Sequence, residues 1–526
     1  MTRTNRLRAL LAGLAALTAL VIAGCGGDDG GGSSGDLAGY APQESPVYVE
    51  GTIQPEGDLR DNIEALVSSV AGIDDPGQRI IDEINSELGA GEGDEGSGMS
   101  YEDDIEPWLG DEAAVFLGDF TGEDENSGVI VATTDSDEAQ NFIDKIADLA
   151  GDSLEKGSYD GSDYLTSSGE ETFGIIDDAV VFGGSEETFK AVADASGGDS
   201  LEDSEDFSTL VDEAPEGSLA NVYVDTEGFL SEVRTRLEPE SRLFFDSLGQ
   251  MGDLGSALVS LVPEANAVEL QALSTAEGVM AEASPELLEQ LPSDAFAALV
   301  APDVGAQLTA VIEQIDSSGI PGEVPPGQLN NALQRFGIDL ARIAQSLGDI
   351  GLYAKGTTRQ DIGGAVVVET DDAQRIAQTL SSVERLLRQR GVEGYQPLPG
   401  DAAGFSIRDP DELGPQPLVF LAQGDRFVIG YGEDSAREAV AGGGGQTLAG
   451  NPIYQEAADA LGDVPPTGFV DLQALLQLVE NVRPDVTSED DYESAQPFLQ
   501  KLAYVVFGTG TEDDLTTARF ILGLTE

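Results

Sequence analysis

An internal repeat constrains the fold of this 526-residue chain more than any other feature of its sequence. Residues 42–49 (PQESPVYV) recur as residues 292–300 (PSDAFAALV), and residues 105–111 (IEPWLGD) recur as residues 343–349 (IAQSLGD). The offset is 250 between the first residues of the first pair and 238 between the last residues of the second. The repeated segments keep the same order, and their offset changes by no more than a difference in loop length would cause. This pattern predicts two homologous units in tandem.

Within each unit, short apolar strands alternate with amphipathic helices. Segments 158–167, 172–177 and 179–184 are expected to be consecutive strands, and their short, turn-rich gaps favour antiparallel pairing. Two apolar stripes at helical spacing predict helices: Leu59, Ile63, Leu66, Val67 and Val70, then Phe142, Ile143, Ile146 and Leu149. Ser136 and Thr370 are the expected N-caps of the helix that follows the second repeated strand in each half.

These patterns predict the α+β class. We expect two homologous tandem domains, residues 40–285 and residues 286–526, each with a largely antiparallel sheet packed with amphipathic helices.

Residues 1–24 are predicted to be a cleaved lipoprotein signal peptide. Three arginines and no acid precede an apolar run at residues 10–22, which is short for a transmembrane helix. The sequence IAGC at residues 22–25 resembles the lipobox of bacterial lipoproteins. That resemblance implies cleavage between Gly24 and Cys25 and attachment of fatty acids such as palmitate to Cys25. The alternative is an ordinary signal peptide with an incidental cysteine, although Cys25 is the only cysteine in the chain.

Residues 25–39 are rich in Gly, Asp and Ser, which predicts a flexible tether. We therefore expect an exported protein whose globular part is held at the outer face of the cell membrane by lipidated Cys25. Beyond the signal peptide, no segment offers about 20 uninterrupted apolar residues, so no second membrane span is expected.

The net charge limits the choice of partners. The chain has 99 Asp and Glu against 25 Lys and Arg, a formal charge of −74. Loss of the signal peptide removes three arginines and leaves 22 basic residues against 99 acidic ones, a charge of −77. Such a chain repels phosphate backbones and anionic membrane surfaces, so no nucleic acid is expected to bind. The expected partners are the membrane, through the lipid anchor, and an unknown protein or small molecule.

The absence of histidine argues against most enzymes. Without His, and with one Cys, this chain cannot hold a Ser-His-Asp or Cys-His site, an ordinary zinc site or an intrachain disulfide. We therefore assign no catalytic residue and no cofactor, and expect a non-enzymatic protein. An enzyme that uses two facing carboxylates stays open. Surface acids could also bind Ca²⁺, but the sequence contains no calcium-loop motif and so no specific metal site.

Trp108 is the only tryptophan and follows Pro107 directly. We interpret this pair as packing residues of the core or of a helix end. The alternative is that they form a ligand or partner site.

The matched segments resemble a bacterial family catalogued as domain of unknown function 3352. The features that carry the resemblance are Pro42 with the strand at residues 47–49, the sequence GDLRD at residues 57–61, DIEPWLG at residues 104–110, and the strand at residues 222–225. The second unit departs from this pattern, because Ser346 stands where the first has Trp108. The resemblance implies an exported, often lipid-anchored bacterial protein and no particular activity.

Together these expectations describe a lipid-anchored, extracytoplasmic protein that acts by binding or as a surface component. The alternative is a solute-binding lipoprotein of a transporter, with its ligand between the two units.

Overall fold

The computed structural model describes residues 36–88, 98–118, 127–167, 171–236, 255–276, 284–305, 308–309, 312, 339–391, 394–398, 403–442, 445–485, 487, 490–512 and 515–525. The chain divides into two compact units. Unit 1 is Met1–Val279 with Thr511–Thr517, and unit 2 is Met280–Gly510 with Ala518–Glu526. The predicted signal peptide, with Gly24 and Cys25, and most of the predicted tether lie outside the described residues.

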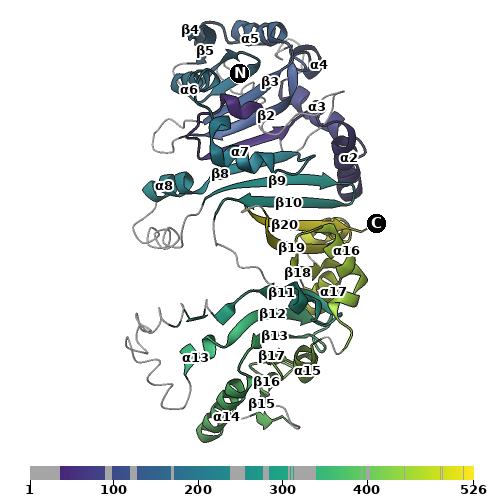
Figure 1. The fold of residues 1–526 in the computed structure, drawn as a ribbon. Helices are drawn as coiled ribbons and strands as arrows, with labels where there is room; N and C mark the ends of the chain where they lie inside the picture. Colours follow the sequence, from purple (N-terminus) through teal and green to yellow (C-terminus); the bar gives the residue numbers. More distant parts are fainter. Residues whose placement is uncertain are drawn as a thin grey trace. The chain divides into compact units, whose positions relative to one another are not determined.

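Unit 1 is built on an antiparallel sheet (Figure 1). Its strands are β1 (Val47–Thr52), β2 (Leu109–Leu117), β3 (Ser127–Thr133), β4 (Leu154–Tyr159), β5 (Ser162–Ser167), β6 (Glu171–Ile176), β7 (Ala179–Gly183), β8 (Ala220–Asp225), β9 (Ser256–Glu264) and β10 (Ala267–Ser274). Hydrogen-bonded neighbours follow the order β4-β5-β6-β7-β3-β2-β1-β8-β9-β10.

Helices cover both faces of this sheet. The helical elements are η1 (Asp36–Tyr40), α2 (Gly57–Ala71), α3 (Pro76–Glu87), α4 (Tyr101–Asp104), α5 (Ser136–Ala150), η3 (Gly151–Ser153), α6 (Glu186–Ser196), η4 (Leu201–Asp203), α7 (Glu205–Asp212) and α8 (Thr226–Arg236). Apolar residues of α3, α4 and α5 form one core with one sheet face. Those of η1, α6 and α7 form a second core with the other face. The sheet is therefore buried on both sides, as its largely apolar strands require.

Unit 2 has a sheet of the same kind. Its strands are β11 (Ala295–Ala301), β12 (Leu347–Lys355), β13 (Gly363–Thr370), β14 (Tyr395–Pro397), β15 (Ala403–Ile407), β16 (Leu418–Gln423), β17 (Arg426–Tyr431), β18 (Pro466–Asp471), β19 (Leu502–Glu512) and β20 (Leu515–Leu524). Neighbours follow the order β14-β15-β16-β17-β13-β12-β11-β18-β19-β20. Each strand number is ten higher than at the same place in unit 1, so the strand orders are identical.

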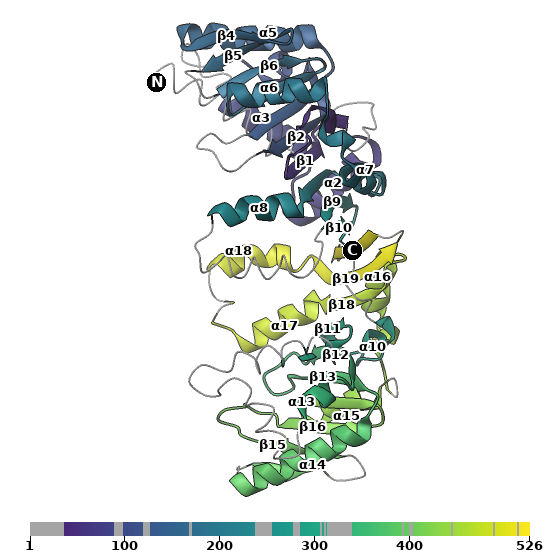
Figure 2. The same ribbon diagram turned by 60° about the vertical axis from the view of Figure 1, so that its left-hand side comes forward.

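The helical elements of unit 2 are α10 (Pro285–Glu289), α13 (Leu340–Ala344), α14 (Ala373–Arg390), α15 (Glu433–Ala441), η5 (Leu448–Gly450), α16 (Pro452–Ala460), α17 (Leu472–Val482) and α18 (Asp490–Leu499). Helix α14 lies along β15 and β16 (Figure 2). Its apolar residues pack on Phe405 and Ala422 of those strands. No helix among the described residues of either unit is long and apolar enough to cross a membrane.

The α+β class is confirmed: helices and a large antiparallel sheet make up the described chain. The identical strand orders are what a duplication requires, although common descent of the units stays a prediction. The predicted boundaries, residues 40–285 and residues 286–526, also stay predictions.

Two local predictions are wrong. The expected single strand at residues 158–167 is a hairpin of β4 and β5, because Asp160 and Gly161 turn the chain with φ of 45° and 96°. The N-caps are Asp135 and Asp372 rather than Ser136 and Thr370. The Asp135 carboxylate accepts hydrogen bonds from the backbone N–H groups of residues 137 and 138, which satisfies two free donors of α5.

Candidate functional site

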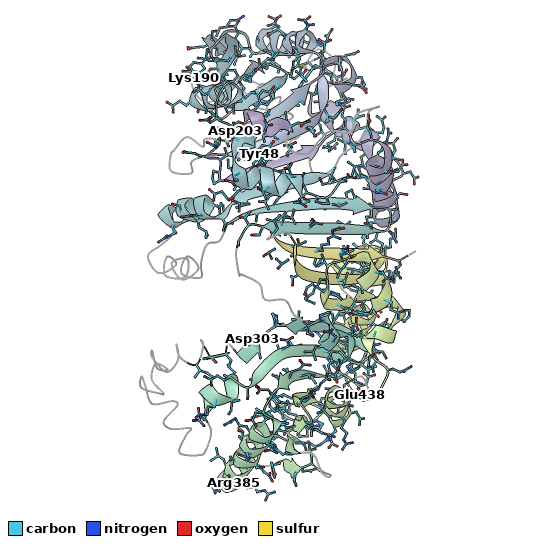
Figure 3. The ribbon with its side chains drawn as sticks, viewed as in Figure 1. Tyr48, Lys190, Asp203, Asp303, Arg385 and Glu438 are labelled. Atoms are coloured by element: carbon cyan, nitrogen blue, oxygen red, sulfur yellow. The ribbon has the colours of Figure 1, made fainter. Side chains whose placement is uncertain are left out.

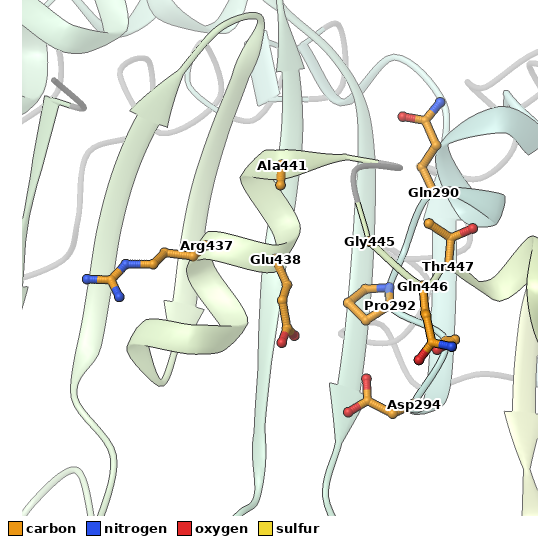
Figure 4. Close-up of a pocket in the computed structure, with 10 residues that line it drawn as sticks. Gln290, Pro292, Asp294, Arg437, Glu438, Ala441, Gly445, Gln446 and Thr447 are labelled. Carbon is orange, nitrogen blue, oxygen red and sulfur yellow. The ribbon is translucent and has the colours of Figure 1, made fainter. Parts of the chain in front are cut away.

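A pocket of about 470 Å³ in unit 2, lined mostly by residues with polar side chains, is the candidate binding site. Its walls are the loop between α10 and β11, the outer side of α15, and residues 445–447 (Figure 4). The lining residues are Gln290, Pro292, Ser293, Asp294, Arg437, Glu438, Ala441, Gly445, Gln446 and Thr447.

Backbone hydrogen bonds fix the two loops of this pocket against each other. Pro292 and Thr447 form an isolated β-bridge, and the Ser293 N–H donates to the Gln446 carbonyl at 3.1 Å. The Asn451 side chain, which caps α16, also donates to the Ser293 carbonyl at 2.8 Å. The pocket is therefore held by main-chain contacts, and a ligand would not have to order it.

Lys355 sets the electrostatics of one wall. Its ammonium group pairs with Asp294 at 3.3 Å and with Glu438, and only 13% of its side chain is exposed. Burial lowers the pKa of Lys355, but its hydrogen bond to Glu438 and the charge of Asp294 outweigh burial and raise it above its ordinary value. In Figure 4, Glu438 extends from α15 toward the loop that carries Asp294, whereas Arg437 points to the other side. Both acids of the pocket are thus engaged with one cation.

A second cation lies buried behind Gln290. Arg426 is 6% exposed and donates to the carbonyl of Ala439 at 3.2 Å and to the side-chain oxygen of Gln290. Within the described part of the chain, Arg426 has no carboxylate as an ion-pair partner. Gly442 makes room for it, because a Cβ there would clash with the guanidinium group. The bond to Arg426 takes the oxygen of Gln290, which leaves its amide N–H groups as donors for a ligand.

This arrangement suits a ligand held by hydrogen bonds better than a reaction catalysed by acid and base groups. Each charged residue of the lining has a partner of opposite charge, because Asp294 and Glu438 pair with Lys355, and Arg437 pairs with Glu433. A general base would need a carboxylate or amine that is free to accept a proton. Here the two acids bind Lys355, so the site suits a small, polar solute without net charge.

Trp108 is buried in the core of unit 1. Its side chain is 0% exposed, its indole N–H donates to the Asp104 carbonyl at 2.8 Å, and its ring lies 5.1 Å from that of Phe142. Pro107, by contrast, is exposed. The burial of the indole fits the packing role, and the pair does not line the pocket of unit 2.

Unit 1 contains a buried acidic pair that the sequence analysis missed. Glu50 on β1 and Glu112 on β2 are 3% and 8% exposed, and Tyr48 donates a hydrogen bond to Glu50. Burial and the charge of Glu50 raise the pKa of Glu112 to about 8. The only sequence indication is an acid in the middle of the apolar strand VYVEGT. No group of three or more acidic or Cys side chains in the described ranges is placed to hold a metal ion.

The pocket residues were also missed, because they come from two stretches about 140 positions apart and form no motif. Cys25 and Gly24 lie outside the described residues, and their predicted roles stay predictions.

A family model described as "Protein of unknown function (DUF3352)" matches residues 10–400. The chain belongs to this family. The match confirms the resemblance drawn from the first unit, and it extends past the end of unit 1 into unit 2 of this DUF3352 protein.

The other comparisons add little. Two solved structures, crystal forms III and I of TP0453, are 11% and 10% identical to the chain, each with a TM-score of 0.25. Each alignment covers 47% of this chain and 81% of TP0453. A likeness this low supports no argument about fold or function. The comparison with curated proteins gave no match.

Proposed function

We propose that this DUF3352 protein is a lipid-anchored, extracytoplasmic protein that acts by binding or as a surface component, without catalysing a reaction. The observation that carries the proposal is the place of its one cysteine. Cys25 follows a basic start, an apolar run and two small residues, and a Gly- and Asp-rich stretch comes after it. Lipidation of Cys25 would hold both units at the outer face of the membrane.

Replacing the anchor residue tests this proposal. Cys25→Ser should move the protein from the membrane fraction to the soluble fraction and abolish incorporation of an alkyne-labelled fatty acid. Gly26→Ser, one position further along, is the matched control and should leave both unchanged. Continued membrane attachment and labelling of the Cys25→Ser protein would contradict the anchor.

The non-enzymatic part of the proposal draws support from the pocket of unit 2. Asp294 and Glu438 both contact the Lys355 ammonium, so neither is available as a free base. A carboxylate-dependent enzyme is the competing proposal, and it needs two acids that face one substrate.

Solute binding is the second candidate, and the pocket of about 470 Å³ favours it. That pocket lies within unit 2, whereas the sequence analysis placed the ligand between the units, and that placement stays a prediction. Because each charged lining residue already has a partner of opposite charge, calorimetry should use zwitterionic amino acids and neutral monosaccharides as probes. One of them should bind the native protein and lose most of its affinity for Gln290→Leu. Thr209→Val, on the exposed side of α7 in unit 1, is the control.

A further inference from the structure

Helix α14 is a basic element in a strongly acidic chain. Its 18 residues hold four arginines, Arg375, Arg385, Arg388 and Arg390, against the single acid Glu384, a charge of +3. The whole chain carries −74. Apolar residues of this helix pack on the sheet of unit 2, and Arg385 and Arg388 are exposed on its outer side. A surface of this kind suits an anionic partner.

Among the arginines of α14 whose side chains are described, Arg385 is the one with no acid as an ion-pair partner. Arg375 pairs with Asp372 at 2.8 Å and Arg388 pairs with Glu384. Arg385 is exposed and donates only to the Ser381 carbonyl and the Ser382 hydroxyl, at 3.3 and 3.0 Å, among the residues described here. Figure 3 shows it on the outer side of the helix.

The surface beside Arg385 is hollowed. A depression of about 470 Å³ lies against α14, and Arg375 and Arg385 are among its lining residues. Ser381 and Ser382 also line it, but their hydroxyl groups donate to the carbonyls of Ala377 and Gln378. Asp339 is the one acid among its lining residues. The hollow therefore offers the guanidinium groups of its two arginines as hydrogen-bond donors for a carboxylate of a partner.

The helix at the same place in unit 1 has the opposite charge. Helix α5 follows β3 as α14 follows β13, and it holds Asp137, Glu138, Asp144 and Asp148 against Lys145, a charge of −3. All four acids are exposed. Lys145 is paired with the buried Asp104, which leaves the acids of α5 without a neighbouring cation on that helix.

The apolar residues with which the two helices pack on their sheets fix the alignment of the helices. Ala139, Ile143 and Ile146 of α5 share their spacing with Ile376, Leu380 and Val383 of α14. In this alignment Glu138 corresponds to Arg375, and Asp148 corresponds to Arg385. Each pair of like charges is separated by ten residues, or about 15 Å along the helix axis. The acidic face of α5 thus presents carboxylates at the spacing of the arginines on α14.

We infer that the basic face of α14 binds the acidic face of α5 in a second copy of this chain. The contact joins unit 2 of one copy to unit 1 of the next, so it is a head-to-tail association that can form rings or filaments. At physiological salt the Debye length is about 8 Å, which screens repulsion between the acidic surfaces but leaves charges in contact attractive.

Charge reversal with complementation tests this inference on the full chain in detergent, by sedimentation velocity. The native chain should self-associate at a concentration of about 100 µM or below. Arg385→Glu and Asp148→Arg should each weaken the association about tenfold, because each turns an attraction into a repulsion. An equimolar mixture of the two variants should associate again, since each supplies the face that the other has lost.

Arg359→Glu is the matched control, because it makes the same charge change on an exposed arginine between β12 and β13. Circular dichroism checks that each variant is folded, and Arg385→Gln serves as the milder variant.

A native chain that stays monomeric would overturn the inference. So would a variant mixture that does not associate, or an Arg359→Glu protein that is weakened as much as Arg385→Glu. If the chain stays monomeric and binds anionic phospholipid vesicles through Arg385, the partner of α14 is a membrane surface and not a second copy of the chain.

Discussion

The carboxyl group of Glu112 lies where burial and the neighbouring Glu50 disfavour a negative charge on it. Burial and the neighbouring Glu50 raise the pKa of Glu112 from 4.5 to about 8. The folded chain therefore keeps a proton on Glu112 at pH values where the unfolded chain has lost it. Stability is fully present below pH 4.5 and falls as pH rises toward 8, at a limiting slope of about 1.4 kcal/mol per pH unit.

Replacing this proton-binding group should remove that pH dependence. Glu112→Gln keeps a neutral side chain of the same shape, so we expect a free energy of unfolding that changes less with pH than that of the native protein. Urea unfolding at three pH values from about 5 to 9 measures the difference. Glu155→Gln, on an exposed position of β4, is the control. Parallel pH profiles for native and Glu112→Gln proteins would contradict the raised pKa.

Composition could not single out Glu112 among 99 acids. Its pKa depends on the pairing of β1 with β2, which places Glu50 near a residue 62 positions away. Trp108 was easier to interpret, because a single tryptophan between apolar residues is most often buried. Sequence thus indicates which residues are apolar, but not which polar residues the sheet brings together.

At the scale of single elements, the cap of α5 makes a direct prediction. The Asp135 carboxylate accepts the backbone N–H groups of residues 137 and 138, at 3.0 and 3.1 Å. Asp135→Ala should therefore lower the free energy of unfolding by about 1 kcal/mol.

Ser136→Ala is the matched control for the cap, because Ser136 is the first residue of α5 and not its cap. Ser136→Ala should lower the free energy of unfolding by less than Asp135→Ala does in the same urea titration. A larger decrease in the free energy of unfolding for Ser136→Ala would show that Ser136, and not Asp135, caps α5.

The sequence predicted the presence of helices and strands better than the residues at which they begin and end. The apolar stripes led to α2 and α5, and the segments at residues 172–177 and 179–184 are close to β6 and β7. The caps were misplaced by one and two residues, because adjacent Asp, Ser and Thr side chains are all good caps and only backbone geometry separates them. The Asp-Gly pair at residues 160 and 161 is a typical hairpin turn, but the prediction placed a single strand across it.

For the whole molecule, the order of segments was the most informative part of the sequence. Matched segments in the two halves occupy matched strands: residues 47–49 lie in β1 and residues 297–299 in β11, next to β8 and β18. The register of those strands and the pocket of unit 2 could not be derived in this way. Both depend on contacts between residues far apart in sequence, which a single sequence does not reveal.

The charge of −74 acts on the whole molecule through repulsion among its surface acids. Repulsion of this kind opposes the compact state and weakens as salt shortens the Debye length, from about 30 Å at 0.01 M to about 3 Å at 1 M. We therefore expect the melting temperature to rise with sodium chloride, by about 2–4 °C for each kcal/mol of repulsion that is screened. Calorimetry in chloride and in sulfate, matched in ionic strength, separates screening from exclusion of the salt. Screening predicts a similar gain in both salts, whereas stabilisation by sulfate alone would show that the acidic surface does not limit stability.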